Sequence, residues 1–136
     1  MQGTFGNKAV KYYAVGKRVL GSTWLQLHII DAAKPSQYEA DVFFGYDDKA
    51  GDFIIHWLDT SGAAGARVVA TGHRDGERLV VVFPYVAGTL RDTFQRDTSR
   101  GIWTVLVESQ EQGGTWSAFG NLRLMHPMKQ KIGHLN

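Results

Sequence analysis

Short stretches of alternating apolar and polar residues recur along the whole chain, separated by clusters of Gly, Asp, Asn, Ser and Pro. This pattern predicts β-strands joined by turns, because side chains alternate across a strand and these turn residues let the chain reverse. No window of twelve residues shows the 3.6-residue repeat of an amphipathic helix. The hydrophobic pattern therefore predicts an all-β protein.

The clearest unit is a hairpin with aromatic-rich strands at 38–46 and 53–59. Gly51 in the turn between them is expected to take a positive φ, which glycine tolerates. The turn also carries three acidic residues that we expect to accept hydrogen bonds from backbone amides: Asp47, Asp48 and Asp52. This hairpin is the unit around which we expect the other strands to pair.

Seven further strands are predicted from the same pattern, at residues 4–15, 19–30, 66–72, 78–85, 89–96, 101–109 and 115–125. Nine strands with short connections indicate an antiparallel meander, and closing it removes the exposed edges that invite aggregation. We therefore predict an all-β, antiparallel up-and-down barrel of about 8–10 strands. A β-sandwich is the alternative, but Greek-key sandwiches need some long connections.

Length and composition are those of one soluble globular domain, residues 1–136, with a polar tail at 126–136. No apolar run approaches the ~20 residues that span a bilayer, and no signal peptide is recognisable, so no membrane partner is expected. The chain has no cysteine, which excludes disulfides and thiolate metal sites and fits a cytoplasmic location. The fifteen basic residues are scattered, and the net charge of +2 argues against a nucleic-acid partner.

An ordered series of short motifs resembles an uncharacterised bacterial family of the calycin superfamily, which also contains lipocalins and fatty-acid-binding proteins. The resemblance covers roughly residues 19–124, on Gly45-Tyr46-Asp47, Phe53, Trp57-Leu58-Asp59-Thr60-Ser61-Gly62, Gly72, Asp75-Gly76, Leu79, Arg91-x-Thr93-Phe94, Glu108, Gly113-Gly114-x-Trp116 and Arg123. It implies a calycin-like barrel with an internal cavity and no particular activity.

Two departures from the wider superfamily limit what the resemblance implies. Lipocalin-like barrels often begin with Gly-x-Trp, where this chain has Gly3-Thr4-Phe5. Fatty-acid-binding proteins often end with an Arg-x-Tyr pair that holds a carboxylate, where this chain has Arg123-Leu124-Met125. The second departure argues against fatty-acid binding.

Alternation within the central hairpin separates two faces. If Tyr46 pairs with Phe53, the face with the larger aromatic area is expected to point inward, and it carries Val42, Phe44, Tyr46, Phe53, Ile55 and Trp57. The opposite face carries Phe43, Ile54, His56 and Leu58 and is also apolar, as are both faces of 78–85. Because a monomeric barrel needs only one apolar face, we expect a homodimer.

Nine residues are candidates for binding a ligand in the barrel: Trp24, Phe44, Tyr46, Phe53, Trp57, Arg91, Trp103, Glu108 and Arg123. If Arg96 opposes Gly101, Arg91 faces Leu106 and lies diagonal to Glu108 on the same side. The Arg91–Glu108 pair then either orients a polar ligand group in the cavity or forms a salt bridge at the surface. The aromatic candidates likewise either line a ligand cavity or pack against one another in a filled core.

No motif indicates catalysis, a metal or a cofactor. The histidines lack the close spacing of a zinc site, and no Gly-x-Ser-x-Gly or nucleotide-binding loop is present. The triplet His73-Arg74-Asp75 reads as a hairpin turn. The favoured function is non-enzymatic binding of a small apolar or amphipathic ligand. The alternatives are an enzyme that uses His56 as a base and a filled barrel that serves as a dimerisation module.

Overall fold

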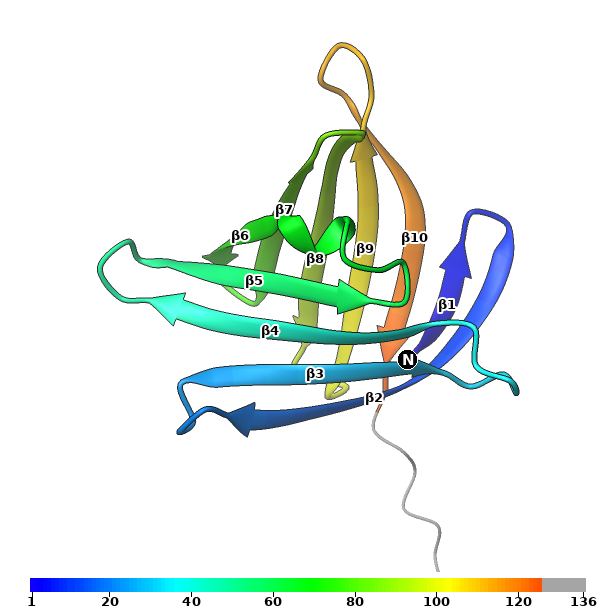
Figure 1. The fold of residues 1–136 in the computed structure, drawn as a ribbon, viewed down its shortest axis with the longest axis horizontal. Coiled ribbons are helices and arrows are strands. Elements are labelled where there is room, and N and C mark those ends of the chain that lie inside the picture. Colours follow the sequence, from blue (N-terminus) through cyan, green and yellow to red (C-terminus); the bar gives the residue numbers. More distant parts are fainter. Residues whose placement is uncertain (126–136) are drawn as a thin grey trace, which may run out of the picture.

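The computed structural model describes residues 1–125, which form ten antiparallel strands and one short 3-10 helix (Figure 1). The strands are β1 (Gln2–Phe5), β2 (Lys8–Val19), β3 (Trp24–Asp31), β4 (Glu39–Asp47), β5 (Asp52–Asp59), β6 (Val69–Asp75), β7 (Arg78–Tyr85), β8 (Gly88–Asp97), β9 (Ile102–Gln110) and β10 (Trp116–Leu124). The helix, η1, is Gly65–Arg67 between β5 and β6. The predicted polar tail at 126–136 lies outside the described residues.

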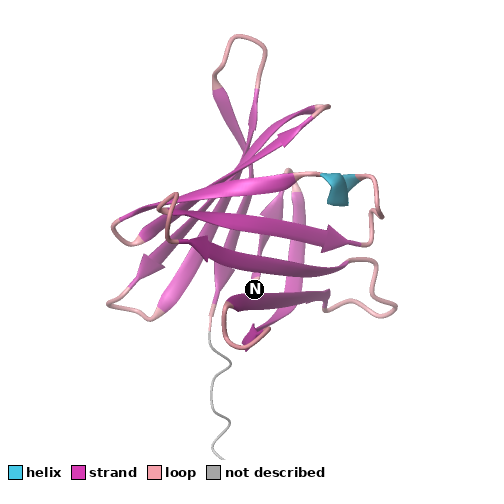
Figure 2. Ribbon diagram, turned by 60° about the vertical axis from the view of Figure 1, so that its left-hand side comes forward, coloured by secondary structure: helices cyan, strands magenta, loops and turns pink. Residues whose placement is uncertain are grey.

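Each strand pairs with its neighbours in the sequence, and β1 pairs with both β2 and β10, so the sheet closes on itself. The predicted antiparallel up-and-down barrel is therefore confirmed. In Figure 1, β3, β4 and β5 run across the view, while β8, β9 and β10 stand nearly upright behind them. Figure 2 shows the same two groups of strands and the β9–β10 turn, which projects from the barrel. No helix among residues 1–125 has the length and apolar character needed to cross a membrane.

The N-terminal strands differ from the prediction. The expected single strand at 4–15 is two strands, because Gly6 takes a φ of 54° and turns the chain between β1 and β2. The expected break at 16–18 is wrong, since Gly16 remains in the ladder opposite Leu27. The chain turns at 20–23 instead, where three consecutive residues have positive φ. A single glycine does not end a strand whose neighbours hold it in register.

The central hairpin has the predicted register, with Tyr46 opposite Phe53. Gly51 has a φ of 76°, and the Asp47 carboxylate accepts the backbone N–H groups two and three residues further on at 3.0 and 3.2 Å. We expected Asp48 and Asp52 to accept backbone N–H groups in the same way, and that prediction is wrong. Asp52 pairs with Asp47 in the ladder, and its Oδ1 is buried without a hydrogen-bond partner among the described residues.

The predicted inward face is confirmed by burial. Val42 and Ile55 are fully buried, and with Ile29, Ala40, Ala70, Val81 and Phe83 they form the larger core cluster. A second cluster of Val105, Val107 and Leu122 lies on β9 and β10. These inner-face side chains surround the space in which the candidate site lies.

Candidate functional site

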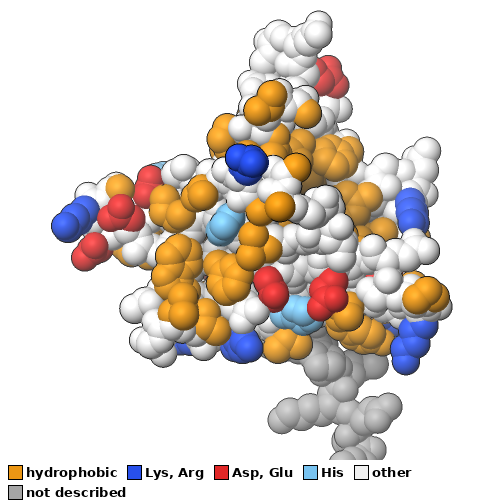
Figure 3. Space-filling model, viewed as in Figure 1, with side chains coloured by type: hydrophobic (Ala, Val, Ile, Leu, Met, Phe, Trp, Pro, Cys, Tyr) orange, Lys and Arg blue, Asp and Glu red, His pale blue; other side chains and the backbone are white. Residues whose placement is uncertain are grey.

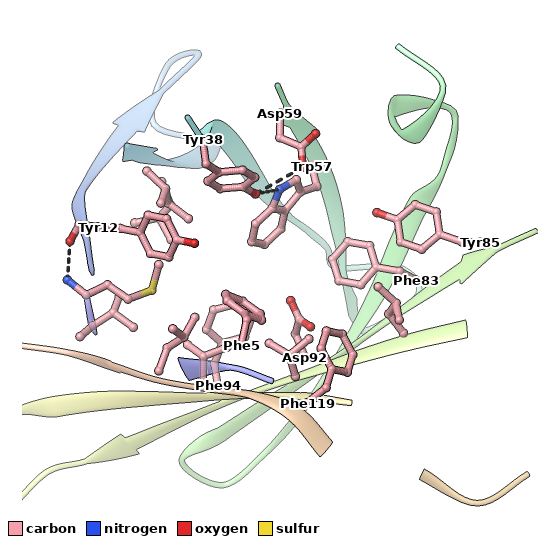
Figure 4. A pocket seen from close by; sticks show the side chains of 18 residues that line it. Phe5, Tyr12, Tyr38, Trp57, Asp59, Phe83, Tyr85, Asp92, Phe94 and Phe119 are labelled. Carbon is pink, nitrogen blue, oxygen red and sulfur yellow. Dashed lines mark hydrogen bonds between the residues drawn. The ribbon is translucent and has the colours of Figure 1, made fainter. Parts of the chain in front are cut away.

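A cavity of about 340 Å³ lies inside the barrel and is lined by eighteen residues (Figure 4). Eight are aromatic: Phe5, Tyr12, Tyr38, Trp57, Phe83, Tyr85, Phe94 and Phe119. Eight are aliphatic or thioether side chains: Met1, Leu27, Ile29, Leu90, Val105, Val107, Leu122 and Leu124. The remaining two are acidic, Asp59 and Asp92. The volume falls within the ~300–1,000 Å³ typical of small-molecule sites, which are also mostly apolar.

Strand alternation determines which side chains reach this cavity. On β8, Leu90, Asp92 and Phe94 face inward, because they are two residues apart. On β5, Trp57 and Asp59 face inward for the same reason. The cavity wall therefore comes from the inner faces of strands far apart in the sequence, which a barrel brings together.

Aromatic contacts hold much of the wall in place. The Trp57 and Phe83 rings meet edge to face at 6.0 Å between centroids, and Phe83 stacks on Tyr85 at 5.8 Å. Tyr12 and Tyr38 pack at 5.6 Å between ring centroids, and Figure 4 shows Tyr38 directly beside Trp57. Edge-to-face and offset contacts of this kind are favourable beyond the area they bury, so the wall is preorganised.

One polar group of the wall, Asp59, is held by hydrogen bonds. The Trp57 indole N–H donates to the Tyr38 hydroxyl at 3.0 Å, and that hydroxyl donates to Asp59 Oδ2 at 3.3 Å. The other oxygen, Oδ1, accepts the backbone N–H of Ser61 at 2.9 Å and the Ser61 hydroxyl. Burial raises the pKa of Tyr38 far above its usual range, so the hydroxyl keeps its proton and remains a donor.

Asp92 is the other acidic group, and its environment differs. It is 7% exposed, and no side chain or backbone group of residues 1–125 forms a hydrogen bond or ion pair with its carboxyl. Figure 4 shows the carboxyl pointing into the cavity. Burial raises the pKa of Asp92 to about 7, because the low-polarity wall disfavours the charged form. Burial also raises the pKa of the Tyr85 phenol, and the charges of Asp59 and Asp92 add to this effect.

Of the nine residues predicted from the sequence to bind a ligand, Trp57 lines the cavity. Phe44 and Phe53 are on the inner face but pack into the core, where Phe44 meets the cavity residue Phe94 edge to face at 5.8 Å. Tyr46 and Trp103 lie near strand ends and are 58% and 39% exposed, so they add nothing to the cavity wall.

The other four candidates were expected in the cavity, and this prediction is wrong. Their positions in the strand ladder place their side chains on the outer surface. Trp24 pairs with Gly45, and its ring covers that glycine from outside, where a Cβ would come within 2.7 Å of the ring. Arg91 and Glu108 alternate with the inward residues Asp92 and Val107. Arg123 alternates with Leu122 and faces outward beside Gln2.

Arg91 and Glu108 stand directly opposite each other, not on the predicted diagonal. The Asp97 carboxylate accepts the Ser99 and Arg100 amides, so the loop begins one residue later than predicted. Arg91 Nε donates to Glu108 Oε2 at 2.8 Å, and its guanidinium lies 4.1 Å from the centre of the Trp116 ring. Of the two interpretations left open by the sequence, the structure supports the surface salt bridge.

Replacing Arg91 by glutamine is expected to leave ligand binding in the cavity unchanged. It should lower the free energy of unfolding by about 1 kcal/mol, through loss of the Glu108 ion pair and the Trp116 contact. Urea unfolding and titration with a hydrophobic probe would measure both. A large loss of probe affinity would contradict the outward position of Arg91.

His56, the base considered for an enzyme, also faces outward, opposite Phe43 on the neighbouring strand. Its Nε2 donates to the carbonyl of Ala66, which is part of η1, at 2.7 Å. Within residues 1–125 no group of three His, Cys, Asp or Glu side chains is arranged to hold a metal ion. None of the eighteen cavity residues is a histidine.

The sequence interpretation missed most of the cavity wall, including Asp59 and Asp92. A signal for Asp92 was present, because Leu90, Asp92 and Phe94 form one alternating face and the acidic residue interrupts it. Which face of that strand points inward was not apparent from this stretch alone. Comparison with family models, with curated proteins and with solved structures gave no significant match for this chain.

Proposed function

We propose that this protein is a non-enzymatic binding protein that holds a small apolar or amphipathic molecule in the barrel cavity. The observation that carries the proposal is the cavity of about 340 Å³ with sixteen apolar or aromatic lining residues. An open interior favours this function over a filled barrel that serves only as a structural module. The outward position of His56 removes the base on which the enzyme alternative depended.

The wall is suited to binding because it is preformed and mostly apolar. Removing apolar surface from water is worth about 25 cal/mol per Å², and preorganised walls reduce the entropy lost on binding. A neutral aromatic probe that fits the cavity is therefore expected to bind with micromolar affinity, about −8 kcal/mol. Trp57 reports such binding, because its indole is part of the wall.

Titration with the neutral probe N-phenyl-1-naphthylamine tests this function. Val107→Phe adds a ring to the buried inner face and is expected to weaken probe binding at least tenfold, by filling the cavity. Leu106→Phe is the matched control, since it adds the same ring to the outer face of the same strand. Thermal unfolding of both variants would establish that each is folded.

The probe is expected to bind the wild type and Leu106→Phe with the same affinity and to bind Val107→Phe weakly. Absence of probe binding to the wild type would contradict the proposal. So would equal binding to all three proteins, because the probe would then sit outside the barrel. Trp57→Phe should abolish most of the change in tryptophan emission without abolishing binding.

We further propose that two copies of the chain associate through the outer face of β3–β6. Leu58 and Val69 are exposed there, beside the partly buried Trp24, Phe43 and Ile54. Figure 3 shows apolar side chains gathered over this part of the sheet. A second copy would cover this apolar surface with an equivalent one, as two-fold symmetric dimers do.

Sedimentation velocity is expected to report a dimer for the wild type and a monomer for Val69→Lys, which places a charge in the apolar patch. Val86→Lys is the control, because Val86 is exposed in the turn between β7 and β8, outside the patch. A wild-type monomer at all concentrations would refute the dimer.

A further inference from the structure

Asp92 interrupts an otherwise apolar stretch of the cavity wall. It sits on β8 between the inward residues Leu90 and Phe94 and opposite Val107 on β9. More than nine-tenths of its surface is buried, and its carboxyl, which opens onto the cavity, has no partner among residues 1–125. Buried polar groups in folded proteins are nearly always hydrogen-bonded, so an unpartnered one in a cavity indicates a missing partner.

We infer that the cavity selects amphipathic ligands that carry a protonated amino group, which binds the Asp92 carboxylate while the apolar part fills the aromatic wall. This inference rests on the proposed binding function and adds the chemical class of the ligand. A charged donor fits because hydrogen bonds between ionised partners are about twice as strong as neutral ones. The apolar surroundings of Asp92 strengthen such a pair further.

The second acidic residue of the wall has a different role. Both oxygens of Asp59 already accept hydrogen bonds, from Ser61 and from Tyr38. Asp59 therefore fixes the Tyr38 hydroxyl, which in turn accepts the indole N–H of Trp57. Asp92 is left as the acidic group that is free to bind a ligand.

The charge of the wall agrees with this assignment. No lysine, arginine or histidine side chain lines the cavity. The amino group of Met1, which also belongs to the wall, donates to the Tyr12 carbonyl at 2.8 Å. Apart from the Met1 amino group, which is already hydrogen-bonded, a carboxylate ligand would meet two acidic side chains and no cationic side chain, whereas an ammonium group would be attracted by both carboxylates.

The ionisation of Asp92 makes the expected binding dependent on pH. The titratable groups that line the same cavity are Asp59, Tyr12, Tyr38, Tyr85 and the Met1 amino group. The tyrosines all have pKa values raised by burial, so they stay neutral below pH 9. Because burial raises the pKa of Asp92 to about 7, its carboxylate forms between pH 6 and pH 8. An ammonium ligand should bind about tenfold more tightly at pH 8 than at pH 6.

Three matched probes separate the contribution of the polar group's charge from that of the apolar ring: 2-(1-naphthyl)ethylammonium, 2-(1-naphthyl)ethanol and 1-naphthylacetate. They share a ring system and differ in the charge of the polar group. Isothermal titration calorimetry at pH 8 would measure their affinities for the wild type, for Asp92→Asn and for Asp48→Asn. Asp48 is an exposed turn residue outside the cavity, so its variant controls for the loss of one negative charge.

The wild type and Asp48→Asn are expected to bind the ammonium probe at least tenfold more tightly than the alcohol and to bind the carboxylate most weakly. Asp92→Asn should lose this preference while its affinity for the alcohol changes less than threefold. An unchanged ammonium preference in Asp92→Asn would overturn the inference and leave Asp92 as a carboxyl solvated by water. Binding of the alcohol without any ammonium preference would overturn the inference and leave the proposed binding function intact. Failure of all three probes would overturn both.

The pH dependence of binding provides a second test, with Asp92→Asn as its control, because burial and the charge of Lys11 lower the pKa of the Met1 amino group in the same wall. Affinity for the ammonium probe should rise about tenfold from pH 6 to pH 8, while affinity for the alcohol stays constant. Ammonium affinity that is equal at the two pH values would contradict a role for Asp92. So would an equal rise in Asp92→Asn, since another group would then be responsible.

Discussion

Replacing Ile55 by alanine is expected to lower the free energy of unfolding by about 2–5 kcal/mol. Ile55 is 1% exposed on the inner face of β5 and belongs to the larger core cluster. Its Cδ1 packs so closely over Gly72 of β6 that a Cβ at Gly72 would lie only 2.8 Å away. Truncation removes the transfer free energy of the lost methyl groups and leaves a void, because neighbouring strands fixed in a barrel cannot close it.

The neighbouring Ile54 is the matched control, since it has the same side chain on the opposite face of the same strand. Ile54→Ala is expected to cost less than half as much as Ile55→Ala, because Ile54 is partly buried on the outer surface. Urea unfolding followed by tryptophan fluorescence would measure both. Equal losses, or a larger loss for Ile54→Ala, would contradict the assignment of the inner face.

Replacing Asp92 by asparagine is expected to stabilise the protein at pH 8. Burial raises the pKa of Asp92 from 3.8 to about 7, and each pKa unit corresponds to about 1.4 kcal/mol. The charged carboxylate therefore destabilises the folded state by up to about 4 kcal/mol at pH 8, an amount that asparagine avoids. A side chain that costs this much stability in the free protein is consistent with a role in binding.

The sign of the pH dependence follows from the direction of this pKa change. The folded state binds the Asp92 proton more tightly than the unfolded chain, so wild-type stability falls relative to the variant as the pH rises from about 4 to about 7. Urea unfolding would measure the difference in free energy of unfolding between Asp92→Asn and the wild type. This difference should be small at pH 4, intermediate at pH 5.5 and complete at pH 8. A difference that is constant with pH would contradict the raised pKa, and Asp48→Asn should show none of this trend.

The strand pattern and the central hairpin could be predicted because they depend on local residues. Alternation between 38 and 59 determined which side chains share a face, and Gly51 and Asp47 determined the turn. The aromatic area of one face then identified it as the inner one, as the burial of Val42 and Ile55 confirms. Each of these inferences used residues close together in the sequence.

The cavity could not be predicted in the same way, because it depends on register across distant strands. A turn between β8 and β9 that begins one residue later than expected moved Arg91 from a diagonal to a direct pairing with Glu108. Trp24 was expected inside because it is large and apolar, but the absence of a side chain at Gly45 lets its ring lie flat on the outer surface. Residue type alone did not distinguish these outer positions from inner ones.

Closure of the barrel also brings together residues that no local motif connects. Tyr12 and Tyr38, from opposite sides of β3, meet Trp57 in one wall, and Asp92 comes from a strand on the far side of the barrel. The cavity residues lie on β1–β3, β5 and β7–β10, with Met1 directly before β1 and Tyr38 in the turn before β4. The site is therefore a property of the closed sheet.

Methyl-group NMR during titration with 2-(1-naphthyl)ethylammonium would show whether a ligand binds inside the barrel. Large shift changes are expected for the inner methyl groups of Val105, Val107 and Leu122, which line the cavity. Small changes are expected for Ile54, Val69 and Leu106, which face outward. Shift changes confined to the outer methyl groups would contradict a ligand site inside the barrel. So would unchanged shifts of the inner methyl groups at a saturating ligand concentration.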